Sequence, residues 1–159
     1  MKSLRIAVVS DTHEYEIQIM KFLDKVQDCD YILHLGDCVK DVEIIRRHFK
    51  GKVINVRGNC DLGNVAPLLI NEEIDRHRIL MSHGHQFSVK SNVMSYLYKA
   101  LESQAKIALF GHTHIEGIEV VEGVHLINPG SLARSKGKGN SYCIIETEKD
   151  KIDAKIMYL

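Results

Sequence analysis

The chain has 159 residues, of which 45% are apolar and 26% charged, and its 21 basic residues balance 21 acidic residues. A chain of this length can bury roughly 68–70% of its unfolded surface, so we expect one domain over residues 1–159 that needs no disulfide or structural metal. The balanced charge argues against an extended nucleic-acid surface. No stretch approaches the ~20 apolar residues of a membrane span, and the scattered cysteines suit reduced thiols, so a cytoplasmic protein without membrane contact is expected.

The first third of the chain alternates between strand and helix patterns. Strands are expected at residues 4–10, 31–35 and 52–56, and the intervening apolar positions recur at helical spacing over 19–26 and 42–49. This alternation is typical of a parallel sheet with right-handed crossovers.

The pattern changes after residue 60. A helix is expected over 89–101, and strands are expected at 68–74, 78–82, 107–110, 118–121, 124–127, 141–147 and 152–158. The last four of these strands form two hairpins. The sequence therefore predicts an α/β fold that is parallel at first and antiparallel later, with two packed mixed sheets flanked by helices.

Side chains able to bind metal collect just after five of the predicted strands. They are Asp11, His13, Asp37, Asn59, His83, His112 and His114. Ligands of open α/β sheets bind at the carboxyl ends of the strands, and residues two apart in extended chain point to the same side. One ion would leave several of these polar groups buried without partners, whereas two ions that share a carboxylate would use all seven.

Each of these residues also has an ordinary explanation. Asp after a strand is often a helix N-cap, and Gly-Asn is often only a turn. Other histidines receive such explanations here: His48 and His77 are expected at the surface, His34 is expected in the core or directly behind the metal ligands, and His125 has no assigned role.

The order of the blocks, Asp-x-His, Gly-Asp, Gly-Asn, His and Gly-His-x-His, resembles the calcineurin-like metallophosphoesterase superfamily. The segment Gly58-Asn59-Cys60-Asp61 is similar to its small prokaryotic phosphodiesterase branch, and the resemblance extends from Asp11 to the turn at residues 128–131. It implies a four-layered α/β/β/α sandwich. It also implies that one ion is held by Asp11, His13 and His114, that the other is held by Asn59, His83 and His112, and that Asp37 bridges the two.

The resemblance further implies hydrolysis of a small phosphodiester by a hydroxide that bridges the two ions. Two divalent ions, two carboxylates and one hydroxide leave such a site with a charge of about +1, which attracts a diester monoanion. Manganese or nickel is expected from the family, while iron, cobalt and zinc also suit mixed nitrogen and oxygen ligands.

The chain departs from the wider family at Cys60, where most members have a histidine that is proposed to protonate the leaving group. A thiol of pKa about 8.5 is a weaker match for that role at neutral pH. His85 or Asp61 could replace it. The candidate catalytic residues are therefore Asp37, Asn59, Cys60, Asp61 and His85, and the candidate substrate contacts are Arg57, Asn59 and His85.

Two other functions remain open at this stage. The same site could serve a phosphomonoesterase or nucleotidase, although only Arg57 and His85 offer extra positive charge nearby. The chain could also be a catalytically weak binding or scaffold module, as is the retromer subunit that resembles these enzymes. Small relatives often pair, so a homodimer or higher homo-oligomer is a further expectation.

Overall fold

The computed structural model describes residues 3–63 and 65–159, which form two five-stranded sheets and three α-helices. The first sheet has the strand order β10-β9-β1-β2-β3. Its strands are β1 (Leu4–Val9), β2 (Tyr31–His34), β3 (Lys52–Asn55), β9 (Ser141–Glu148) and β10 (Lys151–Tyr158). β1, β2 and β3 pair in parallel, and the hairpin of β9 and β10 joins the free edge of β1 antiparallel.

The second sheet has the strand order β4-β5-β6-β8-β7. Its strands are β4 (Leu69–Ile74), β5 (His77–Ser82), β6 (Ile107–Leu109), β7 (Gly117–Val121) and β8 (Val124–Asn128). β5, β6 and β8 are parallel, while β4 and β7 form antiparallel edges.

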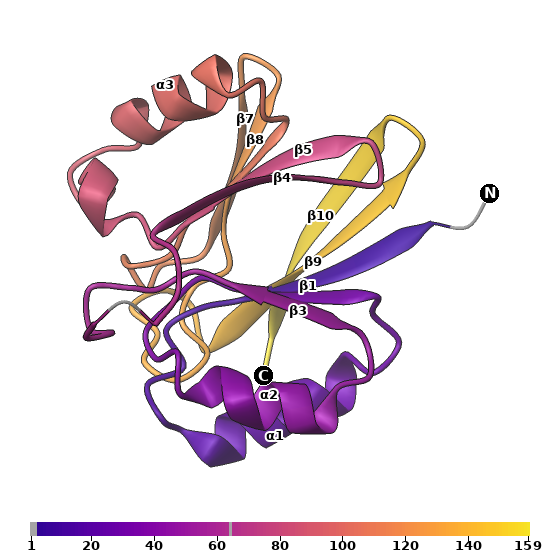
Figure 1. The fold of residues 1–159 in the computed structure, drawn as a ribbon, viewed down its shortest axis with the longest axis vertical. Coiled ribbons are helices and arrows are strands. Elements are labelled where there is room, and N and C mark those ends of the chain that lie inside the picture. Colours follow the sequence, from indigo (N-terminus) through magenta and orange to yellow (C-terminus); the bar gives the residue numbers. More distant parts are fainter. Residues whose placement is uncertain (1–2, 64) are drawn as a thin grey trace.

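The two sheets pack face to face between layers of helices (Figure 1). Helices α1 (Glu16–Lys25) and α2 (Asp41–His48) cover the first sheet, and α3 (Met94–Glu102) covers the second. Alternation along β1 explains the layering, because Ile6 and Val8 face the core between the sheets whereas Ala7 and Val9 face the helices. The predicted four-layered α/β/β/α sandwich is confirmed.

The structure differs from the sequence prediction in three features. The later part of the chain was expected to be antiparallel, yet β5, β6 and β8 pair in parallel at the centre of the second sheet. The helix expected from residue 89 begins only at Met94, because Val89 is already buried in the core beneath it and Asn92 closes a turn by accepting the Met94 N–H at 3.0 Å. His77 was expected at the surface, yet it is 4% exposed and its Nε2 donates to the Lys149 carbonyl at 2.7 Å. The hairpin between β9 and β10 therefore covers this histidine.

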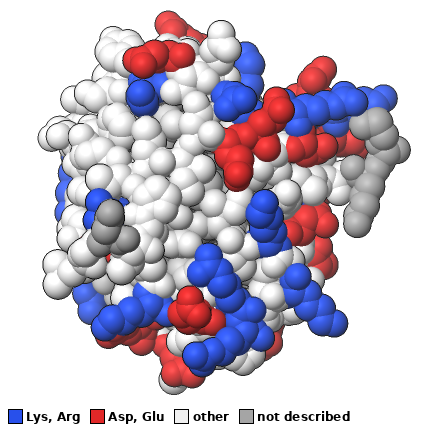
Figure 2. Space-filling model, in the orientation of Figure 1, with Lys and Arg blue, Asp and Glu red and all other residues white. Residues whose placement is uncertain are grey.

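The surface carries charges of both signs. On the face shown in Figure 2, lysine and arginine side chains lie among aspartate and glutamate side chains, without a broad field of one sign. Over residues 3–63 and 65–159, no helix is long and apolar enough to cross a bilayer.

Candidate metal centre

The sheets position the candidate ligands at one edge of the sandwich. Asp11 and His13 follow β1, Asp37 follows β2, and Asn59 follows β3. From the second sheet, His83 follows β5, and the pair His112 and His114 follows β6. The carboxyl ends of two parallel strand sets thus meet across the space between the sheets.

The backbone at these positions is unusual. Five of the seven candidates have positive φ angles, which non-glycine residues rarely adopt: Asp11 (55°), His13 (46°), Asp37 (48°), His112 (72°) and His114 (62°). Such conformations cost energy and cluster at functional sites, where the surrounding structure enforces them. The backbone of the loops that carry these residues therefore directs their side chains towards one another at a cost in local strain.

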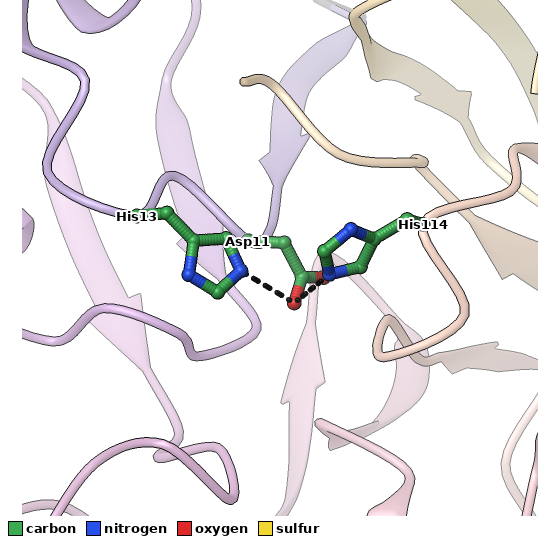
Figure 3. A group of neighbouring side chains, drawn as sticks. All are labelled: Asp11, His13 and His114. Atoms are coloured by element: carbon green, nitrogen blue, oxygen red, sulfur yellow. Dashed lines mark ion pairs between the residues drawn. The ribbon is translucent and has the colours of Figure 1, made fainter. Parts of the chain in front are cut away.

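A first cluster forms around the fully buried carboxylate of Asp11 (Figure 3). Its Oδ1 lies 3.2 Å from Nε2 of His114 and 3.7 Å from Nε2 of His13. The other oxygen, Oδ2, accepts hydrogen bonds from the Ser10 hydroxyl at 2.7 Å and the His112 N–H at 3.2 Å. These bonds fix the carboxylate so that Oδ1 faces the imidazoles.

A second cluster adjoins the first at His83, which is fully buried. Its Nε2 lies 3.4 Å from Oδ2 of Asp37, 3.7 Å from Oδ1 of Asp11 and 3.2 Å from Nδ1 of His112. The ligand atoms of Asp11, Asp37 and His83 all lie within 4.8 Å of one another. Six of the seven candidates therefore form one continuous group of side chains.

Backbone carbonyls orient two of the imidazoles. Nδ1 of His83 donates to the Leu35 carbonyl at 2.9 Å, and Nδ1 of His114 donates to the Arg134 carbonyl at 2.8 Å. A carbonyl can only accept, so the proton of a neutral ring lies on Nδ1 and the Nε2 lone pair faces the cluster. Metal-ligating histidines are typically held in this way.

The clusters fit cations. Oδ1 of Asp11 and Nε2 of His13 are buried, and neither has a hydrogen-bond partner among the described residues. Burial raises the pKa of Asp11, but the nearby imidazoles of His114 and His13 outweigh this and leave the pKa below its ordinary range. Burial acts likewise on Asp37, and contact with His83 outweighs it, leaving a pKa of about 2. Both carboxylates are therefore charged at neutral pH, as metal binding requires.

The histidines divide by charge environment. Burial and the neighbouring His83 lower the pKa of His112 to about 4, so its ring is neutral at pH 7. Burial lowers the pKa of His83, yet the carboxylates of Asp37 and Asp11 reverse this and raise it. A metal ion bound to Nε2 of His83 would displace the proton that the raised pKa favours on that nitrogen.

Asn59 and Cys60 lie on the loop after β3. The Asn59 side chain is exposed, and its amide donates to Sγ of Cys60 at 3.7 Å, so its role as a ligand stays a prediction. The Cys60 N–H donates to Oδ1 of Asp37 at 3.0 Å, which holds this loop against the carboxylate. Gly58 permits the approach, because a Cβ there would collide with the Asp37 carboxylate.

The other candidate residues have different surroundings. Asp61 accepts hydrogen bonds from the N–H groups of Asp37 at 3.0 Å, Val39 at 2.8 Å and Gly58 at 2.7 Å. These three bonds make Asp61 a positioning residue, a role that the sequence analysis did not give it.

His85 and Arg57 also lie near the clusters. The ring centroid of His85 is 5.6 Å from that of His83, and its Nδ1 is buried without a hydrogen-bond partner among the described atoms. Arg57 directs its guanidinium to the Gly63 carbonyl. Their roles as proton donor or substrate contact stay predictions.

Two polar networks surround the centre. The Thr12 hydroxyl donates to Asp41 and accepts from Nε2 of the buried His34, which links the loop after β1 to the start of α2 and to the end of β2. On the other side, Asn128 donates to the Thr113 hydroxyl at 2.8 Å, and the Ser131 hydroxyl donates to the Asp11 carbonyl at 2.8 Å. The turn at residues 128–131 thus supports the site from behind.

The fold and these clusters define a metallophosphoesterase. Residues 4–150 match the calcineurin-like phosphoesterase superfamily domain, and the chain belongs to this metal-dependent family.

Its relatives include small prokaryotic proteins. The probable metallophosphoesterase YsnB of Bacillus subtilis is 32% identical over 151 residues, covering 92% of this chain and 86% of YsnB. Phosphodiesterase MJ0936 of Methanocaldococcus jannaschii is 28% identical over 165 residues, covering 92% of this chain and 95% of that protein. The crystal structure of a predicted phosphoesterase from Streptococcus pneumoniae has a TM-score of 0.84 at 25% identity and covers 99% of this chain and 91% of that chain.

Proposed function

We propose that the protein hydrolyses phosphodiester bonds with two divalent metal ions held at this centre. One observation carries the proposal: Oδ1 of Asp11 is fully buried, lacks a hydrogen-bond partner among the described residues, and lies within 3.7 Å of three imidazole nitrogens. A buried carboxylate so arranged would be costly unless cations satisfied it.

The side chains divide between two ions. Asp11, His13 and His114 would hold one, Asn59, His83 and His112 would hold the other, and Asp37 would bridge the two. In the metal-free geometry Asp11 belongs to both groups of potential ligands. The family pattern gives the bridging role to Asp37. Substitutions of Asp11 and of Asp37 separate bridging by Asp11 from bridging by Asp37. Manganese or nickel is the proposed metal by similarity to the family, while iron, cobalt and zinc also suit these mixed nitrogen and oxygen donors.

Paired divalent ions would supply the charge that neutralises the phosphate and acidifies a water molecule. The net reaction consumes one water: its oxygen joins phosphorus, one phosphorus–oxygen bond breaks, and the alcohol leaves with a proton. Burial and the Asp37 carboxylate raise the pKa of Cys60 to about 11, so the thiol keeps its proton at neutral pH. In the metal-free protein Cys60 is therefore a protonated hydrogen-bond donor beside the centre.

A diester suits the centre better than a monoester. A monoester dianion calls for extra cations, yet the Arg57 guanidinium is bonded to the Gly63 carbonyl, and burial lowers the pKa of His85, with the nearby His83 adding to this. The diester monoanion needs less compensation. The relative named as a phosphodiesterase supports the same choice.

The test is hydrolysis of a chromogenic diester and its monoester by chelator-stripped protein, before and after addition of manganese, nickel, zinc or magnesium. We expect metal-restored activity that is stronger on the diester and is lost in Asp37→Asn. His48→Asn, at an exposed histidine of α2, is the matched control and should retain full activity. A folded protein that binds two ions but hydrolyses neither ester would contradict the proposal and favour a binding module.

A further inference from the structure

A cleft of ≈ 580 Å³ opens directly beside the candidate metal centre. His13, Cys60 and Asp61 form its inner wall, and Cys60 is the residue whose N–H is bonded to Asp37. A larger cleft of ≈ 720 Å³ between the segment that precedes α3 and strand β7 is lined by none of the seven candidate ligands. The smaller cleft is therefore the one through which a group attached to a bound phosphate can extend.

The outer wall of this cleft is apolar. Val39 lies at one side, and the loop between β3 and β4 contributes Leu62 and Val65, whose side chains are 87% and 60% exposed. Large apolar side chains that are this exposed, next to a polar centre, are typical of a surface that binds a ligand. The cleft also has the size of a small-molecule site, for which about 300–1,000 Å³ is usual.

The charged side chains of the cleft already have partners within the chain. Lys40 lies 3.4 Å from Glu14, and Glu43 lies 3.6 Å from Arg46. Asp61 accepts three backbone N–H groups, as described above. The Arg134 guanidinium lies 5.5 Å from the centre of the Tyr15 ring, so its planar face is already ordered against an aromatic side chain. The lining thus carries the three acids Glu14, Glu43 and Asp61 against the two bases Lys40 and Arg134, so the cleft offers no excess of positive charge for a second phosphate.

From this combination we infer that the cleft binds one alcohol half of the diester and that this half is an uncharged nucleoside. A nucleoside offers apolar ring surface for Leu62 and Val65 and a planar face for the Arg134 guanidinium. It carries no charge that the side chains of the cleft would have to neutralise. The inference rests on the phosphodiesterase activity proposed above.

The first test is equilibrium binding of thymidine to the manganese-loaded protein, followed by NMR or calorimetry. Leu62→Asp places a charge on the apolar wall without touching the metal ligands and should weaken thymidine binding at least tenfold. Val120→Asp, on the exposed edge strand β7, is the matched control and should leave thymidine binding unchanged. Thymidine binding that is absent, or that is unaffected by Leu62→Asp, overturns the inference.

The second test separates the cleft from the chemistry. Thymidylyl-thymidine and its 5′-phosphorylated form share one scissile diester, and kcat/KM should be at least fivefold higher for the unphosphorylated compound. Equal or higher kcat/KM for the phosphorylated form overturns the selection of an uncharged group. Hydrolysis of methyl p-nitrophenyl phosphate without thymidine binding refutes nucleoside binding in the cleft and leaves the phosphodiesterase activity supported. Thymidine binding that depends on Leu62, without hydrolysis of any diester, supports the cleft and refutes the proposed activity.

Discussion

Replacement of Asp61 should show whether this residue positions the centre or delivers a proton. Oδ2 of Asp61 accepts the N–H groups of Asp37 and Gly58, and Oδ1 accepts that of Val39. The carboxylate therefore joins the loop after β2, which carries Asp37, to the loop after β3. Asp61→Ala removes all three acceptor contacts. Asp61→Asn can keep its oxygen toward Asp37 and Gly58 and loses only the contact to Val39.

The expected magnitude follows from these bonds. Hydrogen bonds to a charged group contribute about 1.5–3 kcal/mol each, but Asp61 is partly exposed and water replaces part of what is lost. We expect Asp61→Ala to lower the free energy of unfolding by about 2–4 kcal/mol and Asp61→Asn by about 1 kcal/mol. In a chain of this size the alanine variant should melt about 5–15 °C below the wild type.

Urea unfolding of the metal-free proteins, followed by circular dichroism, measures these differences without any contribution from metal or substrate. Asp153→Ala, at an exposed position of β10, controls for the loss of one surface carboxylate and should change stability by less than about 0.5 kcal/mol. If Asp61→Ala is as stable as that control, the positioning role is refuted. Equal loss of hydrolysis in both Asp61 variants at unchanged stability would indicate a proton donor.

Three further predictions concern the metal, pH and Cys60. Manganese at about 100 times its Kd should raise the free energy of unfolding of the wild type by about 2.7 kcal/mol, as measured by thermal unfolding. Asp11→Asn should abolish this gain because it removes a buried ligand charge. An equal gain in the variant would exclude Asp11 as a ligand. Burial lowers the pKa of His34 to about 4 in the folded protein, whereas it is about 6.5 in the unfolded chain. Unfolding below pH 6.5 therefore takes up a proton. The free energy of unfolding of the metal-free protein should fall by up to about 3 kcal/mol from this group as the pH drops from about 6.5 towards 4. His34→Gln should reduce that fall, to which His112 also contributes because its pKa is likewise lowered to about 4, and an unchanged slope in urea titrations across this range would show that His34 is not a source of it. Cys60→His should raise kcat/KM on diesters with poor leaving groups, because imidazole delivers a proton at neutral pH more readily than a thiol; unchanged kinetics would exclude position 60 from proton transfer.

The sequence was informative about the elements. Strands buried on both faces, such as β1, appear as continuous apolar runs, and α1 shows its buried stripe at helical spacing. The start of α3 was misplaced because Val89 is apolar and in helical phase, yet it is buried from a turn that Asn92 closes. Apolar periodicity reports burial, and burial from a turn looks the same in sequence as burial from a helix.

The candidate ligands could likewise be named from the sequence, because strand ends of a parallel sheet meet at one edge whatever the details of packing. Only the tertiary structure decided how they meet: Asp11 belongs to both groups of potential ligands, and backbone carbonyls turn Nε2 of His83 and His114 towards it. It also decided that Asp61 holds two loops together and that Leu62 faces a cleft beside the centre. Chain order determines which residue types follow each strand, whereas contacts between residues distant in sequence depend on side-chain directions that only the packed sheets and loops establish.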